Sequence, residues 1–448
     1  MTFNPHTTQD RAEMLATIGT DTVESLFTAI PSDVRFPTLD LPRQLTEMEA
    51  AARMTELAAK NMAPAAGATF LGAGSYSHYV PATVGQILSR GEFYTAYTPY
   101  QPEVAQGTLQ VIYEFQSLVA ALLGTDVANA SLYDGATAVA EGVLMALASG
   151  KRRNRVVLAG TVHPHYAEVV QTYVSGLDVV IDRLPIPVQE GFVTPTGALS
   201  ERLGDDVACV VVSYPNFFGG IEEIRLIAGA AHEAGAALLV STAPVPLGLL
   251  TPPGDLGADI VTAEGQSLGV AQSFGGPYVG LLGAKRSYLR QMPGRLAGVA
   301  QDSEGKRGFV LTLQTREQHI RREKATSNIC TNQGLMATAA TVYMASVGPE
   351  GFREVATSCY QHAHYLAAQV ATLPGYRVAT AGEFFHELVV ETPEPVGTIN
   401  ARLAGHGIIG GYDLGHLDPA LDRHMLICAT EMNDRTSIDR LVDALSAS

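Results

Sequence analysis

The stretch VACVVVSYPNFFGGIEEIRLIAGAAHEAGAALLVST, residues 207–242, decides the fold. It opens with a strand-length run of apolar, mostly β-branched residues, and a glycine-containing turn separates this run from a segment with helical apolar spacing. A second apolar run follows at residues 236–242. Near-continuous apolar strands joined through a helix are typical of parallel strands buried on both faces. The stretch therefore predicts one strand–helix–strand unit of an α/β sheet.

The same alternation continues on both sides of this stretch. Apolar runs of strand length occur at residues 127–132, 155–159, 177–182, 257–263 and 277–284. Segments with helical spacing lie at residues 107–124, 134–150, 163–176 and 198–203. We therefore predict a large, mostly parallel sheet that is covered by helices and has right-handed crossovers.

The length of 448 residues exceeds what one hydrophobic core usually holds, so we predict more than one domain. Residues 1–66 combine helical segments with a proline-broken stretch and are predicted to form a helical arm. Residues 67–325 carry the alternating pattern of the large domain. Residues 326–448 begin with a long helical pattern and continue as a small α+β domain with strands FHELVVET and HMLICAT.

Charge and cysteine content exclude several classes of protein. The net charge of −16, without a basic stripe, argues against nucleic acid as a partner. No apolar run approaches the roughly 20 residues of a membrane span, and the first residues lack the pattern of a signal peptide. The four scattered cysteines form no CxxC pair, so neither zinc nor a disulfide framework is indicated. We predict a cytoplasmic protein with no membrane partner.

Strand-to-helix junctions at the carboxyl edge of a parallel sheet are the usual place for a ligand. Residues 135–137 open a predicted helix, whose free N–H groups can hold a phosphate, but Asp134 is positioned to cap the same helix. His163 follows the next strand and has the ring needed to stack on a cofactor, or else belongs to a solvated loop. Asn216 follows the strand at 207–214, where it serves equally well as a ligand or as part of a turn.

The order of these elements resembles the aspartate-aminotransferase-like fold, the type I fold of pyridoxal-phosphate enzymes. In that fold the strand after the YPN segment usually ends with an aspartate, which bonds to the ring nitrogen of the cofactor and keeps it protonated. Ser241 stands at this position here. A later strand normally leads to the lysine that forms the Schiff base, whereas Gln266 and Ser267 stand near that position. Neither side chain offers the required amine. Two independent requirements of the cofactor chemistry are therefore missing together.

Three longer motifs make the resemblance more specific. They are FYTAYTPYQPEVAQG (93–107), ADIVTAEGQSLGVAQSFGGPYVG (258–280) and REKATSNICTNQGL (322–335). They resemble the N-terminal half of the glycine decarboxylase of the glycine cleavage system, the P-protein family. The length matches the first subunit of the form that is split into two chains. The resemblance implies that a second subunit carries the lysine and the pyridoxal phosphate, and that the two chains assemble as a heterodimer or an α2β2 tetramer.

The resemblance also implies an activity. With its partner, the chain would decarboxylate glycine, release CO2 and pass the aminomethyl group to the lipoyl arm of H-protein, as glycine dehydrogenase (aminomethyl-transferring). T-protein and L-protein complete the system. The active site is expected near the interface of the two subunits, with pyridoxal phosphate not covalently bound to this chain.

Three groups of residues are the candidates for a contribution to that site. The tyrosine loop offers hydroxyl and amide groups to line the partner's site, and it consists of Tyr94, Thr95, Tyr97, Thr98, Tyr100 and Gln101. A cationic segment could neutralise a carboxylate or phosphate, and it consists of Arg321, Arg322, Lys324, Thr326, Ser327 and Asn328. Ser75 and His78 lie in a glycine-rich segment that allows close backbone approach. Each group also suits a structural role: interface packing, a charged helix end, or an ordinary loop.

Two other functions stay open at this point. The chain could be an independent pyridoxal-phosphate enzyme, such as an aminotransferase or a desulfurase, that uses Lys285 or Lys324. It could also be a non-catalytic scaffold that only stabilises a partner.

Overall fold

The computed structural model describes residues 5–62, 67–150 and 153–446. The chain divides into two units, residues 1–63 and 64–448. None of the helices in the described part of the chain is long and apolar enough to cross a membrane.

The first unit contains the two helices predicted for the arm, α1 (Thr8–Ile18) and α2 (Glu47–Ala58). Both begin with a capping box, in which the threonine before the helix accepts a hydrogen bond from the third helical N–H, and an acidic side chain returns the contact. The caps are Thr7 with Asp10 and Thr46 with Glu49. None of the described arm residues is buried, so local capping rather than a core of its own fixes these helices.

The second unit is built on a seven-stranded sheet with the order β1-β7-β6-β5-β4-β2-β3. Its strands are β1 (Val127–Ala128), β2 (Arg155–Leu158), β3 (Val180–Arg183), β4 (Val207–Tyr214), β5 (Ala237–Thr242), β6 (Ile260–Glu264) and β7 (Gly280–Ala284). Strands β2 to β6 are parallel, whereas β7 and β1 are antiparallel to their neighbours. Every residue of β4 and β5 is buried. This confirms the mostly parallel α/β sheet expected from the apolar runs.

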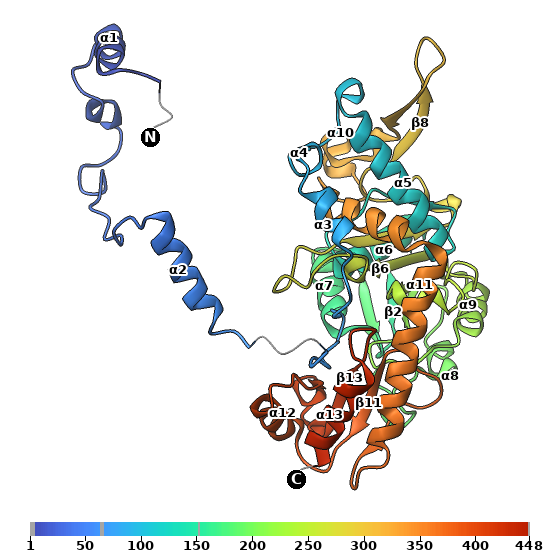
Figure 1. Ribbon diagram of the computed structural model, residues 1–448. Coiled ribbons are helices and arrows are strands. Elements are labelled where there is room, and N and C mark those ends of the chain that lie inside the picture. The colour runs from blue at the N-terminus through green and yellow to red at the C-terminus, as the bar shows by residue number, and fades with distance from the viewer. Residues whose placement is uncertain (1–4, 63–66, 151–152, 447–448) are drawn as a thin grey trace. The chain divides into compact units, whose positions relative to one another are not determined.

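Helices cover both faces of this sheet (Figure 1). The helices in this part of the chain are α3 (Ala82–Leu88), α4 (Gly91–Tyr94), α5 (Gln106–Leu123), α6 (Gly135–Ser149), α7 (Pro164–Val174), α8 (Thr196–Ser200), α9 (Ile224–Glu233) and α10 (Gln318–Arg321). Helix α5 ends as predicted at Gly124, which has a positive φ of 69° that favours glycine. The main core lies between the sheet and helices α5, α6, α7 and α9.

The C-terminal part contains a second, antiparallel sheet with the order β10-β11-β13-β12. Its elements are β10 (Arg377–Val378), β11 (Glu387–Glu391), α12 (Val396–Gly405), β12 (Tyr412–Asp413), β13 (His424–Cys428) and α13 (Arg435–Ser446). Helix α11 (Gly334–Val370) is kinked at Gly348, which precedes Pro349, and its second half runs beside β11 and α13 (Figure 1). The boundaries at residues 66 and 325 stay predictions.

Two regions differ from what the sequence pattern suggested. Residues 82–94, for which the sequence analysis predicted no helix, form the short helices α3 and α4. Strands β8 (Ala297–Gln301) and β9 (Arg307–Leu311) form an unpredicted hairpin that projects from the end of the unit carrying α4 and α10 (Figure 1). The alternating side chains of β8 are partly exposed, so the hairpin lacks the continuous apolar run that marks the buried strands.

Candidate functional site

Parallel strands of the large sheet end together at one edge, where a small pocket lies. The pocket has a volume of about 50 Å³, far below the roughly 300 Å³ at the lower end of ligand pockets. Its walls are Gly74, Tyr76, His163, Tyr166, Ser213, Pro215, Asn216, Phe217, Ser241, Thr242, Ala243 and Glu264. We call it the cofactor position, because the fold resemblance places pyridoxal phosphate at this edge of the sheet.

An internal carboxylate occupies the phosphate end of the cofactor position. Oε2 of Glu264 accepts a hydrogen bond of 2.8 Å from the N–H of Gly135, the first residue of α6. Oε1 of the same carboxyl accepts from the backbone N–H groups of Gln266 (3.0 Å) and Val279 (3.3 Å). Asp134 caps the helix as predicted and accepts from Thr137 N at 2.7 Å. Two of the three N–H groups expected to receive a phosphate, those of Gly135 and Thr137, therefore bind the chain's own acidic side chains.

The two residues near the expected Schiff-base position are also buried in the structure. The Gln266 amide accepts from Tyr76 N at 2.9 Å and donates to the carbonyl oxygens of Tyr76 (3.0 Å) and Val270 (2.9 Å). Ser267 is buried beside it, and its hydroxyl has no hydrogen-bond partner among the described residues. Gln266 therefore fastens the segment at Tyr76 to the end of β6, which is a structural role.

Aromatic rings fill the space in front of the strands. His163 stacks on Tyr166 with ring centroids 4.5 Å apart and planes 13° apart, and it meets Phe217 edge to face. Its Nε2 lies 3.0 Å from the carbonyl oxygen of Ala73. Burial lowers the pKa of His163 to about 4, so the ring is neutral at pH 7. The Asn216 amide makes hydrogen bonds within its own turn and to neighbouring segments. Its oxygen accepts from the N–H groups of Phe218 and Gly220, and its nitrogen donates to Phe192 O and Glu222 Oε1.

Taken together, the residues of the cofactor position do not fit pyridoxal phosphate. The position has no amine for a Schiff base, Ser241 supplies no carboxylate for the ring nitrogen, and Glu264 occupies the phosphate end. Lys285 is no substitute. Ala284 pairs with Ile260, so Lys285 lies at the opposite edge of the sheet, where its Nζ donates to Asp259 at 2.7 Å.

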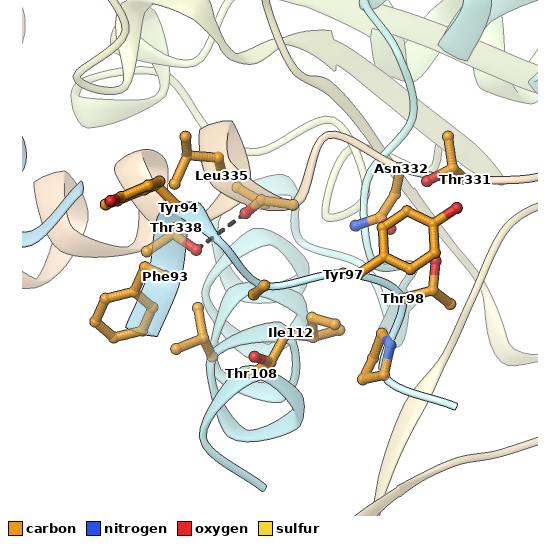
Figure 2. Close-up of a pocket in the computed structure, with 15 residues that line it drawn as sticks. Phe93, Tyr94, Tyr97, Thr98, Thr108, Ile112, Thr331, Asn332, Leu335 and Thr338 are labelled. Atoms are coloured by element: carbon orange, nitrogen blue, oxygen red, sulfur yellow. Dashed lines mark hydrogen bonds between the residues drawn. The ribbon is translucent and has the colours of Figure 1, made fainter. Parts of the chain in front are cut away.

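A larger pocket opens at the tyrosine loop, with a volume of about 240 Å³. Its walls come from the loop at residues 93–99, from helix α5 and from the start of α11 with the segment before it. Figure 2 shows Tyr97 and Thr98 on the same side as Thr331 and Asn332, with Phe93, Tyr94 and Thr338 on the other. We call this the tyrosine pocket. It combines apolar walls with several hydroxyls, as ligand pockets commonly do.

The tyrosine loop is exposed in this chain. Tyr97 is 89 % exposed, and Tyr94 and Tyr100 are about half exposed at 59 % and 49 %. Tyr94, Tyr97 and Thr98 line the tyrosine pocket, whereas Thr95, Tyr100 and Gln101 do not. Exposed tyrosines that surround a concavity are typical of surfaces that become buried in a complex.

A buried arginine, which the sequence analysis missed, supports the tyrosine pocket. Arg295 is only 3 % exposed and donates to Cys330 O at 2.6 Å and to Asn332 Oδ1 at 3.0 Å. Its guanidinium also lies 5.6 Å from the ring centroid of Tyr100. No carboxylate pairs with it in the described part of the chain, so it is held by neutral acceptors. Its one sequence signal was a lone arginine before the apolar run LAGVA.

Comparison with known proteins agrees with this geometry. Residues 1–445 match the family model of the glycine cleavage system P-protein. The chain belongs to the P-protein family.

Within this family, the similarity extends over the whole length. The chain is 57 % identical over 445 residues to the probable glycine dehydrogenase (decarboxylating) subunit 1 of Thermomicrobium roseum, with 99 % of both chains covered. It is 49 % identical to the protein of the same name from Desulforamulus reducens, with 100 % of both covered. A crystal structure of an inhibitor-bound glycine decarboxylase (P-protein) has a TM-score of 0.91 and 42 % identity, and covers 100 % of this chain and 99 % of that one.

More distant structures show the fold alone. The sphingosine-1-phosphate lyase of Burkholderia pseudomallei has a TM-score of 0.66 at 15 % identity and covers 93 % of each chain. The glutamate decarboxylase of Lactobacillus brevis has a TM-score of 0.68 at 14 % identity. These likenesses confirm the type I fold of pyridoxal-phosphate enzymes expected from the element order.

The cationic segment of this P-protein family member is exposed and lies apart from the tyrosine pocket. Arg321, Arg322 and Lys324 form no ion pair with any described residue. Thr326 and Ser327 line a separate narrow crevice, and the lining of the tyrosine pocket begins at Thr331, a few residues later. Asn328 is exposed and lines neither. The structure therefore brings the end of the REKATSNICTNQGL motif, rather than its cations, to the pocket.

Ser75 and His78 face different neighbours. The Ser75 hydroxyl lies 2.8 Å from the hydroxyl of Tyr278, and His78 Nδ1 lies 2.7 Å from Glu431 Oε2 in the C-terminal part. Burial opposes the ionisation of Glu431, but hydrogen bonds from His78 and Tyr79 outweigh it and hold the pKa of this carboxyl at about 2. Neither residue lines the cofactor position or the tyrosine pocket. Their predicted contribution to cofactor binding stays a prediction.

Proposed function

We propose that this chain is the cofactor-free subunit of a two-chain glycine decarboxylase. A second subunit holds the pyridoxal phosphate on its own lysine, and the tyrosine pocket of this chain forms one wall of the shared active site. Together the two chains remove CO2 from glycine and transfer the aminomethyl group to the lipoyl arm of H-protein. The names of the relatives at 57 % and 49 % identity support the role of subunit 1.

One contrast carries this proposal. The cofactor position of this chain has only about 50 Å³ and is filled by Glu264, Gln266 and the His163–Tyr166 stack. The tyrosine pocket has about 240 Å³ and is bordered by exposed tyrosines. A chain whose own site is filled but whose surface carries an open, hydroxyl-lined hollow is suited to complete a site in another chain.

The residues of the tyrosine pocket have the properties that such a wall needs. The hydroxyls of Tyr97 and Thr98 can orient a small zwitterion such as glycine, and Phe93 and Ile112 offer an apolar surface for a lipoyl arm. The exposed cations Arg321, Arg322 and Lys324, which lie apart from the tyrosine pocket, offer positive charge that favours a carboxylate or a phosphate held by the partner.

The alternatives from the sequence are less well supported. An independent pyridoxal-phosphate enzyme would need Lys285 or Lys324, but Lys285 lies at the opposite sheet edge and Lys324 is exposed on the cationic segment. A pure scaffold would not need the open tyrosine pocket. We further propose a cytoplasmic location, in keeping with four cysteines that are all free thiols.

Separate and combined assays test the proposed function. This chain, subunit 2 and their mixture are each given pyridoxal phosphate, lipoylated H-protein and glycine, and the exchange of the glycine carboxyl with labelled bicarbonate is measured. We expect exchange in the mixture and none from this chain alone. Exchange catalysed by this chain alone would contradict the proposal, and so would full exchange by subunit 2 alone.

A further inference from the structure

The N-terminus of α6 and the side chain of Glu264 meet although 129 residues separate them in the sequence. Both carboxyl oxygens of Glu264 are engaged by backbone N–H groups, and the α6 dipole points its positive end at Oε2. Three N–H donors around two oxygens form an arrangement that elsewhere receives a phosphate group. Here the last residue of β6 supplies an accepting carboxyl group from within the chain.

Packing around this contact leaves no room for an anion beside the Glu264 carboxyl. A Cβ added to Gly135 would lie 2.6 Å from the Tyr166 hydroxyl and 2.9 Å from Glu264 Cβ. Tyr166 in turn carries the stacked ring of His163. Burial raises the pKa of Glu264 to about 8 against the effect of its N–H donors, which indicates how closely the carboxyl is enclosed.

We propose that Glu264 is an internal substitute for phosphate, which closes the anion site at the N-terminus of α6, and that removing its carboxyl reopens this site to a phosphate group. The loss of cofactor binding then has a cause beyond the missing lysine. The chain fills its own phosphate site, and the enclosed carboxyl ties β6 to α6 where a bound cofactor would otherwise do so.

The cofactor position is also filled at its other end, where the pyridine ring of the cofactor would lie. The His163–Tyr166 stack and the Gln266 amide are expected to stay in place when Glu264 is changed. The two rings stack on each other, His163 contacts Ala73, and the Gln266 amide bonds to Tyr76 and Val270. Glu264→Ala therefore opens space for inorganic phosphate but not for a substituted pyridine ring. Pyridoxal phosphate is expected to bind that variant no more tightly than inorganic phosphate does.

Three variants of the full chain, assayed without its partner, test this. Glu264→Ala removes the carboxyl, and Glu264→Gln replaces it with an amide that leaves the volume filled. Glu141→Gln is the matched control, because Glu141 is a buried carboxyl on the same helix whose pKa burial raises to about 7, but it lies away from the N-terminus. Each is titrated with inorganic phosphate against chloride at equal ionic strength, and melting temperature and calorimetric binding are followed.

For Glu264→Ala we expect a saturable rise in melting temperature with phosphate and at least tenfold tighter binding than in the wild type. Wild type, Glu264→Gln and Glu141→Gln are expected to show none. Equal phosphate binding by the wild type would overturn the proposal, and so would a folded Glu264→Ala that gains no binding.

Should Glu264→Ala fail to fold in chloride, refolding in phosphate is the deciding measurement. Recovery of folded protein in phosphate but not in chloride supports the proposal. Failure in both salts, while Glu264→Gln folds in chloride, overturns it. Pyridoxal phosphate that bound Glu264→Ala tenfold more tightly than inorganic phosphate would contradict the closure at the ring end.

Discussion

Shortening the side chains of two tyrosine-loop residues, Tyr97 and Thr98, is expected to abolish most of the activity of the assembled complex. The double variant Tyr97→Ala with Thr98→Val removes both hydroxyls and the exposed ring at the mouth of the tyrosine pocket. We expect kcat/KM for glycine–bicarbonate exchange to fall about 100-fold, since the loss of positioning contacts at a reacting centre typically has effects of this size. Stability of this chain should hardly change, because Tyr97 is 89 % exposed in it.

Conservative variants separate catalysis from interface packing. Tyr97→Phe keeps the ring, and Thr98→Ser keeps the hydroxyl. Assembly with subunit 2 is measured by sedimentation beside the exchange assay. A double variant that assembles normally and keeps activity within twofold would show that the loop only packs the interface. If assembly weakens in step with activity, while Tyr97→Phe restores both, the loop contributes through packing rather than through its hydroxyls.

Replacing Arg295 with methionine is expected to be the most damaging single change near the pocket. The substitution leaves the Cys330 carbonyl and the Asn332 amide oxygen without their donor and removes the cation beside Tyr100. Hydrogen bonds made by a charged group contribute about 1.5–3 kcal/mol each to stability. Because Arg295 is 3 % exposed, we expect the free energy of unfolding to fall by about 3 kcal/mol, as measured by urea titration.

The matched control for Arg295 is Arg290. It is an exposed arginine five residues earlier, so Arg290→Met makes the same chemical change at a solvated rather than a buried side chain. We expect it to alter the free energy of unfolding by less than about 0.5 kcal/mol. Arg295→Lys should be intermediate, since an ammonium cannot reproduce the planar fork that spans two acceptors. Equal effects at the two arginines would show that the buried contacts do not hold the pocket wall.

Sequence pattern was sufficient for the sheet because burial imposes a repeating signal. The apolar runs at β4 and β5 and the helical spacing of α9 are local properties, and each predicted its element. The β8–β9 hairpin escaped prediction, since the alternating side chains of β8 are partly exposed. The absence of the aspartate and the lysine that pyridoxal phosphate requires could also be inferred from the sequence alone, because Ser241 stands at one position and the segment after β6 has no lysine.

The contacts that give these positions their roles could not be read from the sequence. Glu264 meets Gly135 only because β6 and α6 converge at one edge of the sheet. Arg295 contacts Cys330 and Asn332, which lie 35 and 37 residues later in the sequence, and no local sequence pattern indicates these contacts. For the same reason the contact of His78 with Glu431, 353 residues away, could not be read from its glycine-rich segment.

The location of the cofactor in the assembled complex tests the central claim most directly. The complex of this chain with subunit 2, loaded with pyridoxal phosphate, is reduced with borohydride, and peptides of both chains are mapped by mass spectrometry. We predict a pyridoxyl group on a lysine of subunit 2 and on none of the five lysines of this chain. A stoichiometric pyridoxyl group on Lys285, Lys324 or any other lysine of this chain would contradict the account.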